Sequence, residues 1–107
     1  RLAGQSEGFF RDWDIVLTPT LAAPTPRLGH LDPTQSFETV MDRLIEWVAF
    51  TPYHNATGDP AISLPLGRGS DGLPLGMMLA AGAGREATLL ELSYELEQAA
   101  PWARIQD

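Results

Sequence analysis

The sequence predicts an α/β protein in which helices flank a mixed sheet, with the element order β-α-β-β-α. Two hydrophobic patterns support this fold class. Short runs of β-branched and other apolar residues occur at 14–18, 60–66 and 73–81, whereas 37–49 and 86–100 have the period of an amphipathic helix. A strand, a helix and a second strand commonly form a parallel crossover. We therefore expect the first two strands to run in the same direction.

The first predicted strand, residues 14–18, is almost entirely apolar, which is typical of a strand that is buried on both faces. It follows a weakly helical stretch at 1–12 and ends at Pro19. Residues 19–35 contain four prolines and Gly29, and they predict an irregular connection. Connections of this length are commonly functional or wrap around a neighbouring surface.

The helix at 37–49 has the clearest pattern in the chain. Its apolar positions follow one helical face: Phe37, Val40, Met41, Leu44, Ile45 and Val48. Ser36 is a suitable N-cap, and Pro52 predicts the end of the helix. We expect residues 51–59 to form a polar turn.

The next two strands predict a β-hairpin, with residues 67–72 as the turn. Pro65 would remove a hydrogen bond from the ladder, so we expect an edge, a bulge or a strand end there. The last helix, at 86–100, carries its main apolar stripe at Leu89, Leu92 and Leu96.

Composition excludes several classes of protein and site. The chain has 7 basic and 14 acidic residues, a net charge of −7 that argues against nucleic-acid binding and against attachment to anionic membranes. It has no cysteine, which excludes disulfides and thiolate sites. All the basic residues are arginines, so no catalytic lysine lies within it. Neither a signal peptide nor an apolar run of membrane-spanning length is visible, and we expect a cytoplasmic protein.

Two short motifs match the residue pattern of a catalytic or cofactor signature but lack the structural context that the signature requires. Gly67 to Gly72 fits GxGxxG, but a strand rather than a helix follows, so a hairpin turn is the better interpretation. Gly4 to Gly8 fits GxSxG around Ser6, although no strand precedes it as a nucleophile elbow requires. A small serine hydrolase built on Ser6, with His30 or His54 as base, is therefore the weaker hypothesis.

A longer set of motifs resembles the C-terminal region of the amidase signature family. Asn55-x-Thr57-Gly58-x-Pro60 continues into Ala-Ile-Ser-Leu-Pro-Leu-Gly, and the segments 14–20 and 71–79 resemble two strands of that family. The Gly-Arg-Glu stretch at 84–86 and the Pro-Trp pair near the end agree with its last helix and tail. These motifs occur in the family's order over nearly the whole chain, and they are most similar to bacterial amidases, including cyclic-amide hydrolases that act on nylon oligomers.

The residues of these motifs predict structural roles. Gly58 can take a positive φ where the loop enters the strand, and Gly76 lets a neighbouring group approach its strand closely. The full set of structural motif residues is Asn55, Thr57, Gly58, Pro60, Gly72, Pro74 and Gly76.

The resemblance implies that residues 1–107 are the C-terminal fragment of a single amidase signature domain. Members of the family hydrolyse amides to an acid and ammonia or an amine, through a serine, a cis-serine and a lysine, without a metal or organic cofactor. These residues lie upstream of the region that this chain resembles, and the chain begins within a predicted helix, as if cut from a longer protein. We therefore expect the chain alone to be inactive, with the upstream portion as its partner and a small amide as substrate.

The resemblance also indicates which residues form part of the substrate pocket. These are Trp47, Phe50, Thr51 and Tyr53, at the end of the second predicted helix and in the following loop. Packing of the helix end explains them equally well. The alternative function is a non-catalytic module that folds alone or associates with itself as a homo-oligomer.

Overall fold

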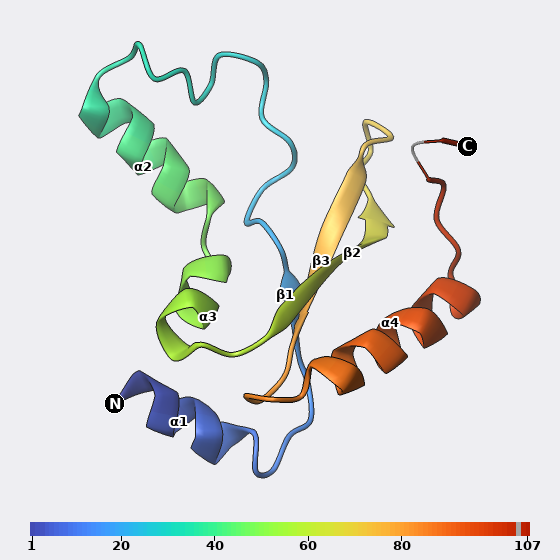
Figure 1. Cartoon of the computed structure of the whole chain (residues 1–107). Coiled ribbons are helices and arrows are strands. Elements are labelled where there is room, and N and C mark those ends of the chain that lie inside the picture. Colours follow the sequence, from blue (N-terminus) through green and yellow to red (C-terminus); the bar gives the residue numbers. More distant parts are fainter. Residues whose placement is uncertain (105) are drawn as a thin grey trace.

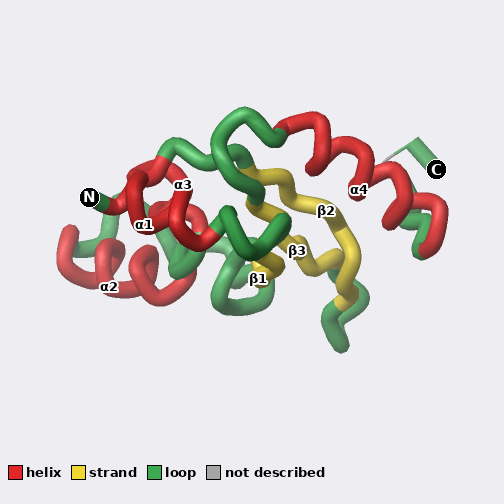
Figure 2. The backbone as a smooth tube through the Cα atoms, turned by 90° about the horizontal axis from the view of Figure 1, so that it is seen from below, coloured by secondary structure: helices red, strands yellow, loops and turns green. Residues whose placement is uncertain are grey.

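The computed structural model describes residues 1–104 and 106–107 of the chain. Its elements, in order, are α1 (Leu2–Phe9), β1 (Val16–Pro19), α2 (Phe37–Trp47), α3 (Thr51–Thr57), β2 (Ala61–Arg68), β3 (Pro74–Ala80) and α4 (Glu86–Ala99). The predicted α/β class is confirmed. Figures 1 and 2 show the strands between α4 on one side and the group of α1, α2 and α3 on the other.

The sheet has the strand order β1-β3-β2, and both pairings are antiparallel. β1 and β2 therefore run in the same direction, as predicted, but β3 lies between them. The described part of the sheet is thus antiparallel at each pairing rather than mixed. The reason is the short β2–β3 connection, which places β3 beside β2 and leaves the other edge of β3 to pair with β1.

One face of the sheet packs against α4 and forms the core. Leu64 of β2, Leu79 of β3 and Leu89 of α4 are buried there together with Ala81. Ile62 of β2 pairs with Leu79 of β3, so the two side chains lie on the same face of the sheet. Leu64 is two residues after Ile62 and therefore also faces the helix. The predicted stripe of α4 is in place, because Leu92 and Leu96 also pack against this cluster.

The opposite face carries small and hydroxyl side chains. The hydroxyls of Thr20, just after β1, and Ser63 of β2 lie 2.6 Å apart in a hydrogen bond. This bond crosses the central strand above Gly76, whose carbonyl accepts from the Thr20 N–H at 3.0 Å. A Cβ on Gly76 would lie 2.8 Å from the Thr20 hydroxyl and 2.9 Å from the Ser63 hydroxyl. The absence of a side chain at Gly76 therefore permits the bridge between the outer strands.

The helix α2 forms where its pattern predicts, but its apolar stripe does not enter the core. Ser36 caps it by accepting from the Thr39 N–H at 3.3 Å. No residue of α2 is buried, and Phe37 and Ile45 are 78% and 65% exposed. Arg43 instead ties the helix to the preceding connection through the His30 carbonyl at 2.7 Å. The stripe of α2 is thus only partly covered within the described residues.

The prediction of a polar turn at 51–59 was wrong, because most of this segment is α3. Pro52 lies in the first turn of the helix, where its missing N–H leaves no hydrogen bond unmade. It therefore separates α2 from α3 rather than ending helical structure. Gly58 then ends α3 in the left-handed conformation, with φ of 80°, and the chain enters β2.

The hairpin carries an irregularity at the predicted proline. β2 is an edge strand of the described sheet, and its register against β3 shifts between Leu64 and Gly67. Pro65 lies inside this shift, where its lack of an N–H costs no ladder bond.

Replacing Gly76 tests the bridge over the central strand. We expect Gly76→Ala to lower the free energy of unfolding by about 1–3 kcal/mol, because the added methyl group overpacks the Thr20–Ser63 contact. Gly8→Ala is the matched control, since its Cβ would meet nothing within 4 Å and α1 would gain helix propensity. Urea unfolding of both variants measures the difference, and equal stabilities would contradict the close approach.

Candidate functional site

Two adjoining cavities lie on the side of the sheet away from α4. The first, here called the helical pocket, has a volume of about 340 Å³ and is lined by Ser6, Phe9, Phe10, Val16, Thr18, Ala49, Phe50, Tyr53 and His54. The second, here called the sheet pocket, has a volume of about 400 Å³ and is lined by Thr20, Thr51, His54, Asn55, Asp59, Ala61, Ile62, Ser63 and Met78. His54 lines both cavities.

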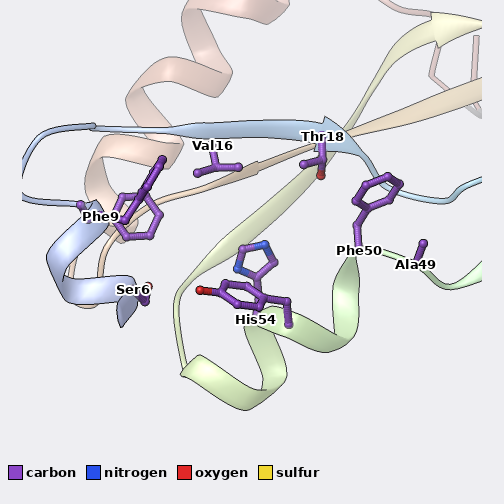
Figure 3. A pocket seen from close by; sticks show the side chains of 9 residues that line it. Ser6, Phe9, Val16, Thr18, Ala49, Phe50 and His54 are labelled. Carbon is purple, nitrogen blue, oxygen red and sulfur yellow. The ribbon is translucent and has the colours of Figure 1, made fainter. Parts of the chain in front are cut away.

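The helical pocket is built from one side of β1 and one side of α3. Val16 and Thr18 are two residues apart and so lie on the same face of β1. Phe50 at the start of α3 and His54 are four residues apart and so lie on the same side of the helix. Figure 3 shows the imidazole of His54 projecting from α3 towards β1, with Phe50 on one side of it and Phe9 of α1 on the other.

Two buried polar atoms of this pocket have no hydrogen-bond partner within the described residues: Thr18 Oγ1 and His54 Nδ1. Leaving a buried polar atom unpaired costs about 1–3 kcal/mol. Figure 3 shows both side chains at the same cavity. Both atoms are shielded by the surrounding side chains and stay unpaired within the part of the chain that the structure describes.

The floor of the site is held by a hydrogen-bonded clamp that joins α1 to the end of α3. Ser6 is 2% exposed, and its hydroxyl donates to Asp59 Oδ2. The Thr57 hydroxyl donates to the same oxygen at 2.6 Å. Ser6 lies inside the helix α1, not at a strand-to-helix turn, and its proton goes to a carboxylate rather than to histidine. The nucleophile elbow that the GxSxG letters suggested is therefore not formed.

The structure distributes the four predicted pocket residues over three places. Phe50 and Tyr53 line the helical pocket, and Thr51 lines the adjoining sheet pocket. Trp47 is not brought to them, because it lies at the end of α2 and lines a separate cavity against the long connection. Its buried Nε1 has no partner within the described residues.

The comparisons with known proteins agree with this fold. Residues 1–90 match the model of the Amidase family. The chain belongs to the amidase family.

Relatives of this amidase chain cover almost all of it. The protein named "Putative amidase AmiC" in Mycobacterium leprae is 58% identical over 106 residues, which are 99% of this chain and 22% of that protein. The 6-aminohexanoate-cyclic-dimer hydrolase of a Pseudomonas strain is 37% identical over 94% of the chain and 22% of its own length. The solved structure of 6-aminohexanoate cyclic dimer hydrolase with substrate superposes with a TM-score of 0.79 at 36% identity, and the match covers 94% of this chain and 22% of that one. The chain thus spans about a fifth of the length of these relatives.

The amidase motif residues lie around the site and in the hairpin. Asn55 lines the sheet pocket, Thr57 belongs to the clamp, and Gly58 turns the chain into β2. The Pro60 carbonyl accepts from the Ala81 N–H at 3.1 Å, next to the β2–β3 pairing. In the hairpin Gly72 has φ of 81°, and Pro74 begins β3 next to Gly76 in the same strand.

The sequence analysis named His54 only as a possible base for Ser6, and it did not single out Thr18. Both could have been found from spacing, because His54 is one turn of helix after Phe50 and Thr18 alternates with Val16. The first signal was lost when Pro52 was interpreted as a helix end. The second was lost because the strand was expected to be buried on both faces, whereas exposed and half-buried residues alternate along β1.

The carboxyl group of Asp32 has a lowered pKa. The Thr34 N–H and the Thr34 hydroxyl donate to Asp32 Oδ1 at 2.8 and 2.7 Å and lower the pKa of that carboxyl. The charged form is thereby favoured, so this contribution to stability is present above the ordinary pKa and is lost as the pH falls through the lowered one. Asp32 lies in the long connection and does not line either pocket.

The described residues show neither a metal-binding cluster nor a membrane-spanning helix. No group of three or more acidic or histidine side chains that could hold a metal gathers among them. None of their helices is both long and apolar enough to cross a membrane. The expectations of no cofactor and of a cytoplasmic location stay predictions.

Replacing Ser6 tests the clamp. We expect Ser6→Ala to lower the free energy of unfolding by about 1.5–3 kcal/mol, because Asp59 loses a buried hydrogen bond. Ser70→Ala is the control, because Ser70 is exposed in the hairpin loop and should change stability by less than about 0.5 kcal/mol. Thermal or urea unfolding measures both. In the full polypeptide, a loss of amide hydrolysis by Ser6→Ala with unchanged stability would instead restore the catalytic hypothesis for Ser6.

Proposed function

We propose that this chain is the C-terminal segment of an amide hydrolase, in which it supplies scaffold and part of the substrate pocket. The observation that carries the proposal is the match to the Amidase family together with coverage of 22% of the relatives' length. The chain has no lysine, so a serine, cis-serine and lysine triad would come from the upstream portion of the polypeptide. The reaction would convert a carboxylic amide to the acid and ammonia or an amine.

The exposed surface supports a role within a larger domain. The accessible area is 7909 Å², whereas a monomer of 11.6 kDa is expected to expose about 5,800 Å². The radius of gyration is 16.0 Å, against about 13 Å for an independent domain of this length. The excess area is larger than the roughly 800 Å² that one partner buries in a standard interface. A whole domain, rather than a small partner, would account for it.

The position of α2 supports the same proposal. An amphipathic helix forms stably when its apolar stripe is buried against another element. The stripe of α2 includes Phe37 and Ile45, which are largely exposed within this chain. We propose that the upstream portion covers α2 and the sheet edges at β1 and β2.

Comparing the full polypeptide with its C-terminal segment tests the proposed function. We expect the full polypeptide to release ammonia from simple primary amides and residues 1–107 alone to show no turnover, because the triad is upstream. An ammonia assay on both proteins measures this, with the upstream lysine replaced by alanine in the full polypeptide as the control. Turnover that tracks residues 1–107 alone, or a full polypeptide without amidase activity, would contradict the proposal.

The alternative is a non-catalytic, self-associating module, and the exposed stripe of α2 favours it for the isolated chain. Apolar faces and open sheet edges promote association when nothing covers them.

We expect residues 1–107, expressed alone, to form dimers or larger species rather than monomers. Sedimentation velocity measures this, and Ile45→Lys, which places a charge on the stripe, should shift the distribution towards monomer. A monodisperse and stably folded monomer would count against self-association and against the need for a covering portion.

We also propose a bacterial, cytoplasmic setting for the enzyme. Support comes from the bacterial origin of the similar proteins and from the absence of cysteine in this chain.

A further inference from the structure

We propose that the cavity between the long connection and α2 is a binding site for a small carboxylate with an apolar body. This cavity, here called the connection pocket, has a volume of about 310 Å³, and its lining includes Pro24, Arg27, His30, Arg43, Glu46 and Trp47. It shares no lining residue with the helical pocket or the sheet pocket. The connection pocket is therefore separate from the site described above.

The connection pocket forms where the connection folds back onto one side of α2. Arg43 and Trp47 are four residues apart and lie on the same side of the helix. The His30 N–H donates to the Arg27 carbonyl at 3.1 Å in a turn of the connection, and the Ala22 N–H donates to the Trp47 carbonyl at 3.0 Å. Figure 1 shows the connection arching from β1 to the start of α2. The pocket is thus held together by backbone hydrogen bonds.

Positive charge gathers at this pocket although the chain as a whole is acidic. The net charge of the chain is −7, yet Arg27 and Arg43 both line the pocket, against a single carboxylate, that of Glu46. Neither arginine forms an ion pair within the described residues, where the ion pairs involve Arg85 and Arg104 instead. One added negative charge would therefore balance the excess positive charge of the pocket.

The guanidinium of Arg43 is oriented through one of its nitrogens. Nη1 donates to the His30 carbonyl at 2.7 Å and to Gln35 Oε1 at 2.9 Å. Gln35 is fixed in turn, because its Nε2 donates to the Gly29 carbonyl at 2.7 Å. Nε and Nη2 of Arg43 have no hydrogen-bond partner in the part of the chain that the structure describes, and such a pair of nitrogens matches the two oxygens of a carboxylate. A donor that is already oriented lowers the cost of binding.

The apolar part of the wall favours a ligand with a hydrocarbon body. The half-buried Trp47 lines the pocket together with Pro24 and Pro26, and burial of aliphatic carbon against these rings is favourable. Glu46 would repel the second charge of a phosphate dianion. The ligand class is therefore a monocarboxylate with a short apolar chain. The acid that the proposed amide hydrolysis releases belongs to this class, and only that link rests on the proposed function.

The competing occupant is an acidic side chain of the upstream polypeptide. It would pair with the same guanidinium groups inside the folded protein and leave no place for an added carboxylate. Removing the charge of Arg27 would then lower the stability of the protein rather than its affinity for a ligand. Measuring both quantities separates the two occupants.

The test is calorimetric titration of the full polypeptide with hexanoate at low salt. Hexanamide, which has the same chain without the charge, and inorganic phosphate are the comparison ligands. Arg27→Gln is the main variant, because Arg27 is exposed and has no ion pair to lose within the described residues. Arg43→Gln is the second variant. Arg11→Gln is the matched control, because Arg11 is exposed and does not line the connection pocket.

We expect the unmodified protein and Arg11→Gln to bind hexanoate equally, and about fivefold more tightly than hexanamide or phosphate. Arg27→Gln should weaken the binding of hexanoate about threefold, as the loss of an exposed ion pair does, and Arg43→Gln about tenfold. The affinity should fall as sodium chloride is added, because salt screens the charges. A melting temperature for each variant reports whether folding is preserved.

Four results would overturn the inference. The first is an unmodified protein that does not bind hexanoate, and the second is equal affinity for hexanamide, which would show that the charge is not recognised. The third is binding that Arg27→Gln and Arg43→Gln both leave unchanged, which would place hexanoate elsewhere in the protein. The fourth is a melting temperature that Arg27→Gln lowers while hexanoate does not bind, which would assign the arginine to an upstream side chain.

The binding of hexanoate is measured without turnover. A full polypeptide that hydrolyses no amide would therefore contradict the proposed function and leave the result on the connection pocket in place. An active polypeptide that gives any of the four results above would keep the proposed function and lose the carboxylate site.

Discussion

β3 forms backbone hydrogen bonds along both of its edges, and β1 and β2 hold their places in the sheet only through it. The side chains of β3 divide the chain into two environments. Leu79 faces α4 and belongs to the buried core, whereas Gly76 leaves the other face open to the Thr20–Ser63 hydrogen bond. A side chain at Gly76 would separate the outer strands, and both pockets depend on their positions.

The face away from α4 is suited to binding because its polar groups are fixed but incompletely paired. The clamp of Ser6, Thr57 and Asp59 satisfies its own members and holds α1 against the end of α3. Above it, Thr18 and His54 retain unpaired atoms at an aromatic cavity. This contrast indicates that the clamp has a structural role, because it holds the two helices together.

The exposed apolar residues of this chain agree with its short length relative to other members of the family. The chain matches the Amidase family over residues 1–90 and spans about a fifth of the relatives' length. The apolar stripe of α2 is largely exposed in this chain, with Phe37 and Ile45 as its most exposed members. The core against α4 is the exception, because the hairpin and the last helix are close in sequence and pack locally.

The sequence by itself determined the α/β class, the family, the hairpin and the positions of α2 and α4, because these depend on local periodicity and on motifs that are contiguous in the chain. The resemblance also predicts that Trp47, Phe50, Thr51 and Tyr53 form part of the substrate pocket, and this stays a prediction. Only the tertiary structure decided that β3 lies between β1 and β2, since strand order depends on which edges meet in space. It also placed His54 and Thr18 at one cavity and joined Ser6 to Asp59, although the members of each pair are distant in the sequence. Such contacts leave no periodic signal, because each depends on how separate elements pack.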